Sequence, residues 1–131
     1  MSKVEVKLMA GEVVPRLNGL KKLVEKDLPI KAAYRLSRII KAYQDEAKTY
    51  EESRLKLINK YCKKDKEGSP VTKDGVYHFD PKGRAAFDKE MQNLFATAIT
   101  IEAAPLSLGE LEGTEVSASD LLLLGDFLKE D

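Results

Sequence analysis

The sequence predicts an α+β protein that is mainly α, with a long central helix, two or three shorter helices and a small antiparallel sheet. Between residues 30 and 62 there is no Gly or Pro, and apolar side chains recur at three- and four-residue spacing over about four heptads. Two short segments, residues 4–8 and 98–103, alternate apolar and polar residues as half-exposed strands do. The 131 residues, 43% of them hydrophobic, are expected to form a single domain, 1–131.

The first element is expected to be a strand, because Val4, Val6 and Leu8 alternate with charged residues. The alternative is that this segment simply leads into the first helix. Apolar spacing predicts that helix over residues 10–27, with Pro15 in its first turn. Pro29 then interrupts the pattern and is suited to open the next helix, where its missing N–H costs nothing.

The long helix is expected over 30–62 and would be about 48 Å long at 1.5 Å per residue. A domain of this size does not need such a helix, so we expect it to project or to be covered by a second subunit. Its apolar stripe is interpreted as a seam for a homo-oligomer or another protein partner, and consists of Leu36, Ile40, Tyr43, Ala47, Tyr50, Leu57 and Tyr61.

Residues 63–75 are polar and rich in turn signals, and Val71 and Val76 are candidates to flank a hairpin. A short strand is expected over 76–79. Asp80 and Pro81 form a helix start, a cap followed by a first-turn proline, and that helix is expected to run through about Thr97.

The C-terminal part is expected to contain a strand over 98–103, an acidic loop over 105–115 and a final helix. A capping box at Ser117–Asp120 predicts the start of that helix, which would run through Leu128. Its leucines and phenylalanine suggest either packing on the protein's own core, which we favour, or docking in a partner's groove through Leu121, Leu124, Phe127 and Leu128.

The net charge of zero conceals an asymmetry. Residues 1–64 carry sixteen Lys and Arg against eight Asp and Glu, whereas residues 65–131 carry six against fourteen. The last thirty-three residues contain one Lys and eight acids. Such a distribution serves self-association between opposite halves, or reflects two halves that neutralise each other within one fold.

Catalytic and metal-binding signals are weak. Cys62 is the single cysteine, which excludes an internal disulfide and a zinc site built from four cysteines. His78 is the single histidine, and both residues are expected to be structural rather than catalytic. The glycines are scattered and form no phosphate-binding motif, and the acids Glu110, Glu112 and Glu115 lack the spacing of a calcium loop. We therefore expect no enzymatic activity, no metal and no cofactor.

A basic face on the long helix is the clearest candidate binding surface, because its cations lie nearly opposite the apolar stripe. They are Lys31, Arg35, Arg38 and Lys41. This face could hold phosphates, but Asp45 and Glu52 continue it and aromatic residues for stacking are not evident. An acidic protein partner or plain solvation is therefore preferred to nucleic acid.

The order of features resembles a family of small phage and prophage proteins of unknown function. The resemblance is carried by Leu-Pro-Ile-Lys at 28–31, by Ala33, Tyr34 and the Tyr43–Tyr61 stripe, by Lys-Asp-Lys-Glu-Gly at 64–68 and by Ser-Ala-Ser-Asp-Leu at 117–121. It implies a viral origin and a non-enzymatic accessory role, and it supplies no catalytic residues.

These observations together predict a phage-encoded protein–protein interaction factor, either in virion assembly or the tail, or as an inhibitor of a host protein. The alternative is a small nucleic-acid-binding regulator that uses the basic face. The N-terminus lacks the apolar stretch of a secretory signal and no segment is long enough to span a membrane, so we expect no membrane partner, and a location in the host bacterial cytoplasm or the virion.

Overall fold

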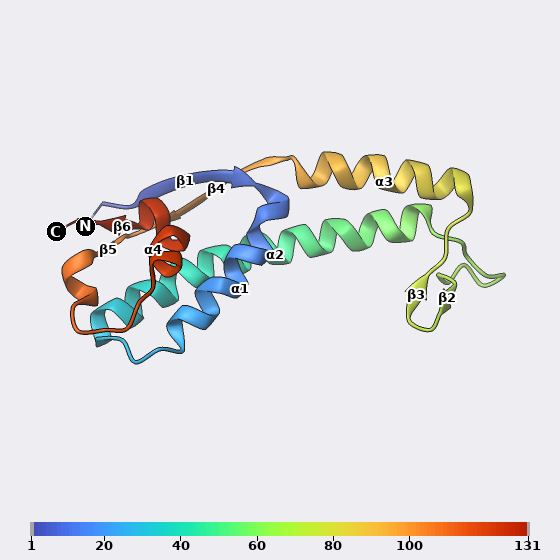
Figure 1. Ribbon diagram of the computed structural model, residues 1–131. Helices are drawn as coiled ribbons and strands as arrows, with labels where there is room; N and C mark the ends of the chain where they lie inside the picture. Colours follow the sequence, from blue (N-terminus) through green and yellow to red (C-terminus); the bar gives the residue numbers. More distant parts are fainter. Residues whose placement is uncertain (1, 131) are drawn as a thin grey trace.

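The structure, a computed structural model, describes residues 2–130 and has two parts that share one helix (Figure 1). The first part, the lobe, contains both chain ends and combines helices with short strands. Its elements are β1 (Val4–Met9), η1 (Ala10–Glu12), α1 (Val13–Val24), the first half of α2 (Ile30–Tyr61), β4 (Ala98–Ala103), β5 (Leu106–Ser107), η2 (Leu108–Leu111), α4 (Ala118–Leu124), η3 (Gly125–Phe127) and β6 (Leu128–Lys129).

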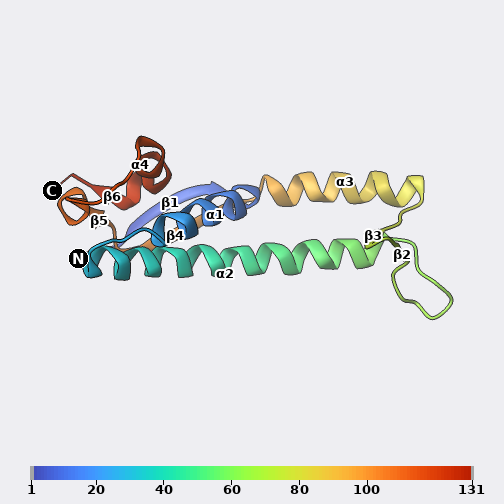
Figure 2. The same cartoon turned by 60° about the horizontal axis from the view of Figure 1, so that its bottom comes forward.

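The second part, the arm, is a helical hairpin. The second half of α2 extends beyond the lobe and α3 (Pro81–Phe95) packs along it, as Figure 2 shows from a second direction. A two-strand hairpin, β2 (Thr72–Lys73) and β3 (Val76–Tyr77), forms the tip. The prediction of a mainly α protein with a long central helix is therefore confirmed, and the helix projects from the lobe as expected.

The strands predicted from residue 4 and over residues 98–103 pair with each other. β1 and β4 run antiparallel, from Val4 opposite Ala103 to Met9 opposite Ala98. Leu8 and Ile101 are buried on the face toward the helices, whereas the alternating charged residues are exposed. This pairing brings the N-terminus of the chain beside the segment that follows β4.

The core fills the lobe and includes most of the predicted stripe's first half. Leu36, Ile40 and Tyr43 are buried there against residues of α1, β4 and the C-terminal segment. The expectation that these three side chains form a seam for a second subunit is therefore wrong. The periodicity was correct, but the protein's own elements cover that part of the helix.

Ala47 is half-buried against the core of the lobe. The rest of the stripe lies in the arm, where Tyr50, Leu57 and Tyr61 are half-buried. This half of α2 packs against α3, which has no fully buried residue of its own.

The start of α3 follows the sequence prediction. Asp80 caps the helix by accepting a hydrogen bond from the Gly83 amide at 2.7 Å, and Pro81 follows as the first helical residue. A Cβ atom at Gly83 would lie 2.6 Å from the carbonyl oxygen of Tyr61 at the end of α2. A glycine at this position therefore allows the two helices of the arm to approach closely where the chain turns back.

The C-terminal region differs from the prediction in two respects. Residues 105–115 are not simply a loop, because they contain β5 and η2. The final helix ends at Leu124 rather than Leu128, since Gly125 adopts a positive φ of 53° that an α-helix cannot continue. The chain then forms η3 and β6, and β6 pairs in parallel with β5.

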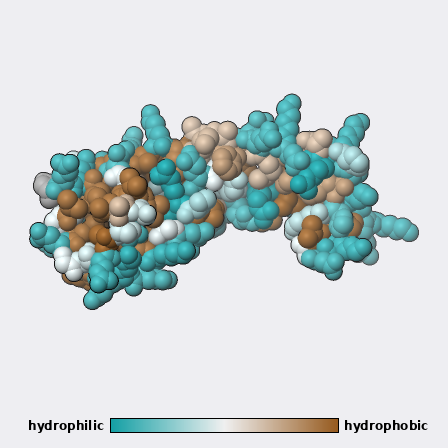
Figure 3. Space-filling model, viewed as in Figure 1, coloured by the Kyte–Doolittle hydropathy of each residue, from teal (hydrophilic) through white to brown (hydrophobic). Residues whose placement is uncertain are grey.

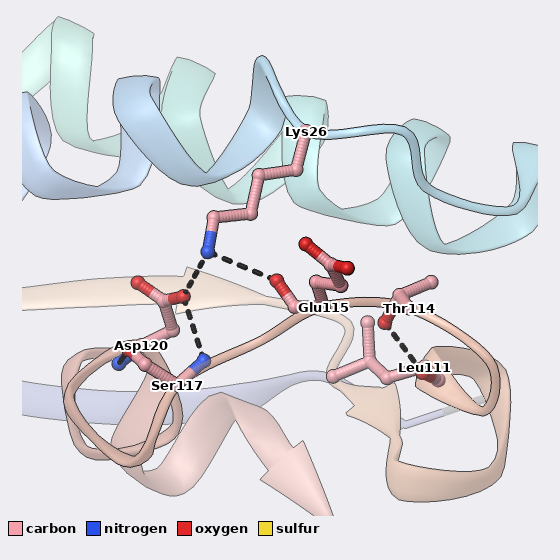
Figure 4. A network of polar contacts seen from close by, with 6 residues as sticks. All are labelled: Lys26, Leu111, Thr114, Glu115, Ser117 and Asp120. Carbon is pink, nitrogen blue, oxygen red and sulfur yellow. Dashed lines mark hydrogen bonds and ion pairs between the residues drawn. The ribbon is translucent and has the colours of Figure 1, made fainter.

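A polar network fastens the C-terminal segment to the end of α1 (Figure 4). The Lys26 ammonium group donates to the Asp120 carboxylate at 2.8 Å and to the Glu115 carbonyl oxygen at 3.0 Å. Asp120 also accepts from the Ser117 amide, which completes the predicted capping box. The last helix, α4, is thus held against the other elements of the lobe.

Candidate anion-binding groove

The basic face predicted on the long helix lines a hollow of about 800 Å³. α2 forms one wall, and the ends of the β1–β4 pair form the other. The lining residues are Lys3, Ile30, Lys31, Tyr34, Arg35, Arg38, Lys41, Ala42, Asp45, Glu102, Ala103 and Ala104. We call this hollow the basic groove.

Helical spacing places the α2 side chains in the basic groove. Lys31, Arg35 and Arg38 follow one another at intervals of four and three residues, so they lie along one face of the helix. Leu36 and Ile39, on the other side of α2, are completely buried in the core and fix the rotation of the helix. The orientation of the basic face is therefore set by the same packing that stabilises the lobe.

The second wall depends on strand pairing. Because Val4 is the partner of Ala103, Lys3 at one strand end meets Ala104 at the other. This pairing adds a fifth cation to the four on α2 and adds one acid, Glu102. With Asp45 the lining holds five cations and two acids, a net charge of +3.

Most of these cations are free to meet a ligand. Within residues 2–130, Arg35 is the one cation of the basic groove that takes part in an ion pair. Lys31, Arg38 and Lys41 are exposed and have no acidic partner in that part of the chain. They are available to an anion without first breaking an internal contact.

Arg35 is held in place by Glu110 of η2, through an ion pair that is partly buried. One carboxylate oxygen of Glu110 accepts a hydrogen bond from the Arg35 guanidinium. The same oxygen accepts hydrogen bonds from the amide and the hydroxyl group of Ser107, both at 3.0 Å. Burial opposes ionisation, but these donors and the Arg35 charge outweigh it and hold the pKa of Glu110 below its ordinary value. The guanidinium is therefore fixed in the wall of the basic groove.

Two large side chains give the basic groove an apolar component that was not predicted from the sequence. Ile30 is 83% exposed and Tyr34 is 64% exposed. Both lie on the same helical rows as Lys31 and Arg38, and this spacing was a signal that could have revealed them. Lys3 was also missed, since its position depends on the pairing of β1 with β4.

The predicted docking residues of the final helix have mixed positions. Leu124 and Phe127 are buried, and the Phe127 ring meets the Tyr43 ring edge to face at a centroid distance of 6.4 Å. Leu121 and Leu128 are half-buried against the core. Leu124 and Phe127 therefore pack on the protein's own core and cannot be anchors for a partner. Leu122, which was not singled out, is 80% exposed.

His78 and Cys62 lie at the base of the arm's tip. The backbone of His78 bonds to Lys63 and Val71, and Cys62 is buried at the end of α2. Within residues 2–130, His, Cys, Asp and Glu form no group of three or more that could hold a metal ion.

In the same part of the chain no helix has both the length and the apolar character required to cross a membrane.

Comparison of the chain with protein-family models, with curated proteins and with solved structures finds no match.

Proposed function

We propose that this protein is a non-enzymatic binding protein whose basic groove receives an acidic segment of another protein. The observation that carries the proposal is the combination of unpaired cations with exposed Ile30 and Tyr34 in one hollow. Apolar and aromatic anchors beside complementary charges are characteristic of protein–protein contacts.

The size and charge of the basic groove favour a short peptide segment. Lys31 and Lys41 are ten residues apart, so the row of cations is about 15 Å long. An extended peptide of about five residues covers that distance at about 3.3 Å per residue. The net charge of the lining is +3, or +2 when Glu110, the partner of Arg35, is included. This charge suits two or three carboxylates, and it is small for a surface that follows a nucleic-acid backbone.

The resemblance to phage and prophage proteins fits this proposal. A virion-assembly or tail-associated factor and an inhibitor of a host protein both need a surface that recognises a partner, and neither needs a catalytic centre. The basic groove supplies such a surface, and the core of the lobe holds the groove's helix in place.

A nucleic-acid-binding regulator is the second candidate, and Tyr34 favours it. An exposed aromatic ring among cations can stack on a base while the cations contact phosphates. Single-stranded nucleic acid would fit this arrangement better than a duplex, whose bases are already stacked.

A binding experiment tests both candidates. A fluorescent ten-residue Glu-rich peptide and a fluorescent oligothymidylate are titrated with the protein at several salt concentrations, with anisotropy as the readout. The double variant Lys31→Glu with Arg38→Glu should bind the peptide at least about tenfold more weakly, a loss of about 1.4 kcal/mol. The matched control, Lys21→Glu with Lys48→Glu, makes the same charge change at exposed positions outside the basic groove and should bind as the wild type does.

Each result has a defined meaning. Peptide binding that only the groove variant weakens supports the proposal. Binding of the oligothymidylate alone, with a steep salt dependence that the groove variant reduces, establishes the second candidate in its place. Equal weakening in the control variant, or binding of neither probe, contradicts both.

A further inference from the structure

The acidic C-terminal third of the chain is only partly neutralised within the fold. Glu110 pairs with Arg35, and Asp120 pairs with Lys26. Both pairs join the basic half of the chain to the acidic half, so the charge asymmetry of the sequence contributes to internal contacts. After residue 105, four other acids are exposed and have no ion-pair partner within residues 2–130, namely Glu112, Glu115, Asp126 and Glu130.

An exposed leucine accompanies these acids. Leu122 lies on α4, whose other leucines are half-buried or buried, yet it is 80% exposed. Figure 3 shows apolar side chains gathered on the lobe in the region of α4 and β5. Asp126 and Glu130 follow Leu122 within eight residues. All three side chains are exposed and come from one short segment that runs from α4 through η3 to the residue after β6. We call Leu122, Asp126 and Glu130 the C-terminal face.

The C-terminal face and the basic groove are complementary. Ile30 and Leu122 have the highest exposed fractions among the large hydrophobic side chains of the described residues. Ile30 stands beside unpaired cations. Leu122 is followed by Asp126, Lys129 and Glu130, so residues 122–130 carry a net charge of −1. One surface thus offers an apolar anchor with positive charge, and the other an apolar anchor with negative charge.

From this complementarity we infer that the basic groove of one copy binds the C-terminal face of a second copy. The inference rests on the proposed function, because it assigns an occupant to the same groove. It names that occupant as an acidic segment of this chain. The two internal ion pairs show that the same chemistry already joins the two halves within one molecule.

The contact is heterologous, since the two surfaces consist of different residues. Both surfaces belong to the lobe, so the arms lie outside the contact (Figure 1). Most of the complementary charges are exposed, and screening by salt weakens such pairs. Self-association should therefore depend on protein concentration and decrease strongly as salt is added.

A charge-swap experiment tests the inference by sedimentation equilibrium. The groove-reversed variant is Lys31→Glu with Arg38→Glu, and the face-reversed variant is Asp126→Lys with Glu130→Lys. At low salt the wild type should show an average mass above the 14.6 kDa of one chain, and high salt should return it to that mass. Each variant alone should remain monomeric, because like charges then face each other.

The decisive sample is an equimolar mixture of the two variants. In the mixture, the acidic groove of the groove-reversed variant meets the basic C-terminal face of the face-reversed variant. The unchanged basic groove of the face-reversed variant likewise meets the unchanged acidic C-terminal face of the groove-reversed variant. Self-association should therefore return to the wild-type level. Leu122→Ser should weaken the wild-type association at constant charge, and Lys21→Glu with Lys48→Glu should leave it unchanged. Far-UV circular dichroism confirms that every variant is folded.

The outcomes separate this inference from the proposed function. A wild type that remains monomeric at low salt, or a groove-reversed variant that associates as the wild type does, overturns the inference. So does a mixture that stays monomeric. If the wild type still binds the Glu-rich peptide through the basic groove in any of these cases, the proposed function stands; loss of both activities overturns both.

Discussion

Replacement of Phe127 by alanine tests whether the C-terminal segment belongs to the core. The Phe127 ring is 1% exposed and meets the Tyr43 ring edge to face at an interplanar angle of 70°. Removal of a buried phenylalanine costs about 3–5 kcal/mol, from lost burial and the cavity left behind. The aromatic pair with Tyr43 places the expected loss in the upper part of that range. Such a loss is a large part of the roughly 5–15 kcal/mol by which an ordinary domain is stable.

The control for this variant lies five residues earlier in the chain. Leu122 is 80% exposed, so Leu122→Ala should change the free energy of unfolding by less than about 0.5 kcal/mol. Urea unfolding of the wild type and both variants, followed by circular dichroism at high salt to suppress self-association, gives the comparison. Equal effects of the two substitutions, or a loss below about 1 kcal/mol for Phe127→Ala, would refute the reasoning that the last segment completes the core.

Three other predictions concern stability. Gly83→Ala should destabilise the arm by about 1–3 kcal/mol, because its Cβ would meet the Tyr61 carbonyl oxygen at 2.6 Å; hydrogen exchange of α3 amides should accelerate, and unchanged exchange contradicts the close approach. Asp80→Ala removes the cap of α3 and should cost about 1 kcal/mol in urea unfolding, whereas Asp88→Ala, at an exposed pair, should cost less. Contacts with Lys26 and Ser117 lower the pKa of Asp120 from its ordinary value of 3.8. Burial of Glu110 is outweighed by its contacts with Ser107 and Arg35, which lower its pKa from the ordinary value of 4.5. The two ionised carboxylates stabilise the fold fully above those ordinary values, and this stabilisation is lost as the pH falls through the lower folded-state pKa values. The double variant Glu110→Gln with Asp120→Asn should therefore lose less unfolding free energy than the wild type as the pH is lowered. An equal loss in the variant and the wild type contradicts this assignment.

Long periodic segments could be predicted from the sequence, and short ones could not. The absence of Gly and Pro between residues 30 and 62 and the regular apolar spacing located α2 almost to the residue. Strand β4 was located at its observed bounds by alternation. In contrast, β5 and β6 have two residues each, too few to show a period, and they exist because they pair with each other.

The apolar stripe shows a different limit. Spacing indicates that Leu36 and Tyr43 face something apolar, but it does not say whether that is a second copy or the protein's own core. The structure places both side chains in the core, where α1, β4 and the C-terminal segment cover them. The same spacing continues into the arm, where α3 lies against it.

The candidate site could be predicted in part. The cations of α2 share a face because of local helical geometry, so their grouping was visible in the sequence. Lys3 and Glu102 join them only through the pairing of strands almost a hundred residues apart, which no local pattern encodes. The groove's ion pair between Arg35 and Glu110 likewise depends on the tertiary fold.

A site-resolved titration tests the central claim most directly. Two-dimensional ¹H–¹⁵N NMR spectra of the labelled protein are recorded at high dilution while the Glu-rich peptide is added. We expect the shifted amide signals to cluster in two segments, residues 30–45 of α2 and residues 102–104 at the end of β4, and the arm beyond residue 50 to stay unchanged. Shifts confined to the arm, or absent throughout, would contradict the assignment of the basic groove as the binding site.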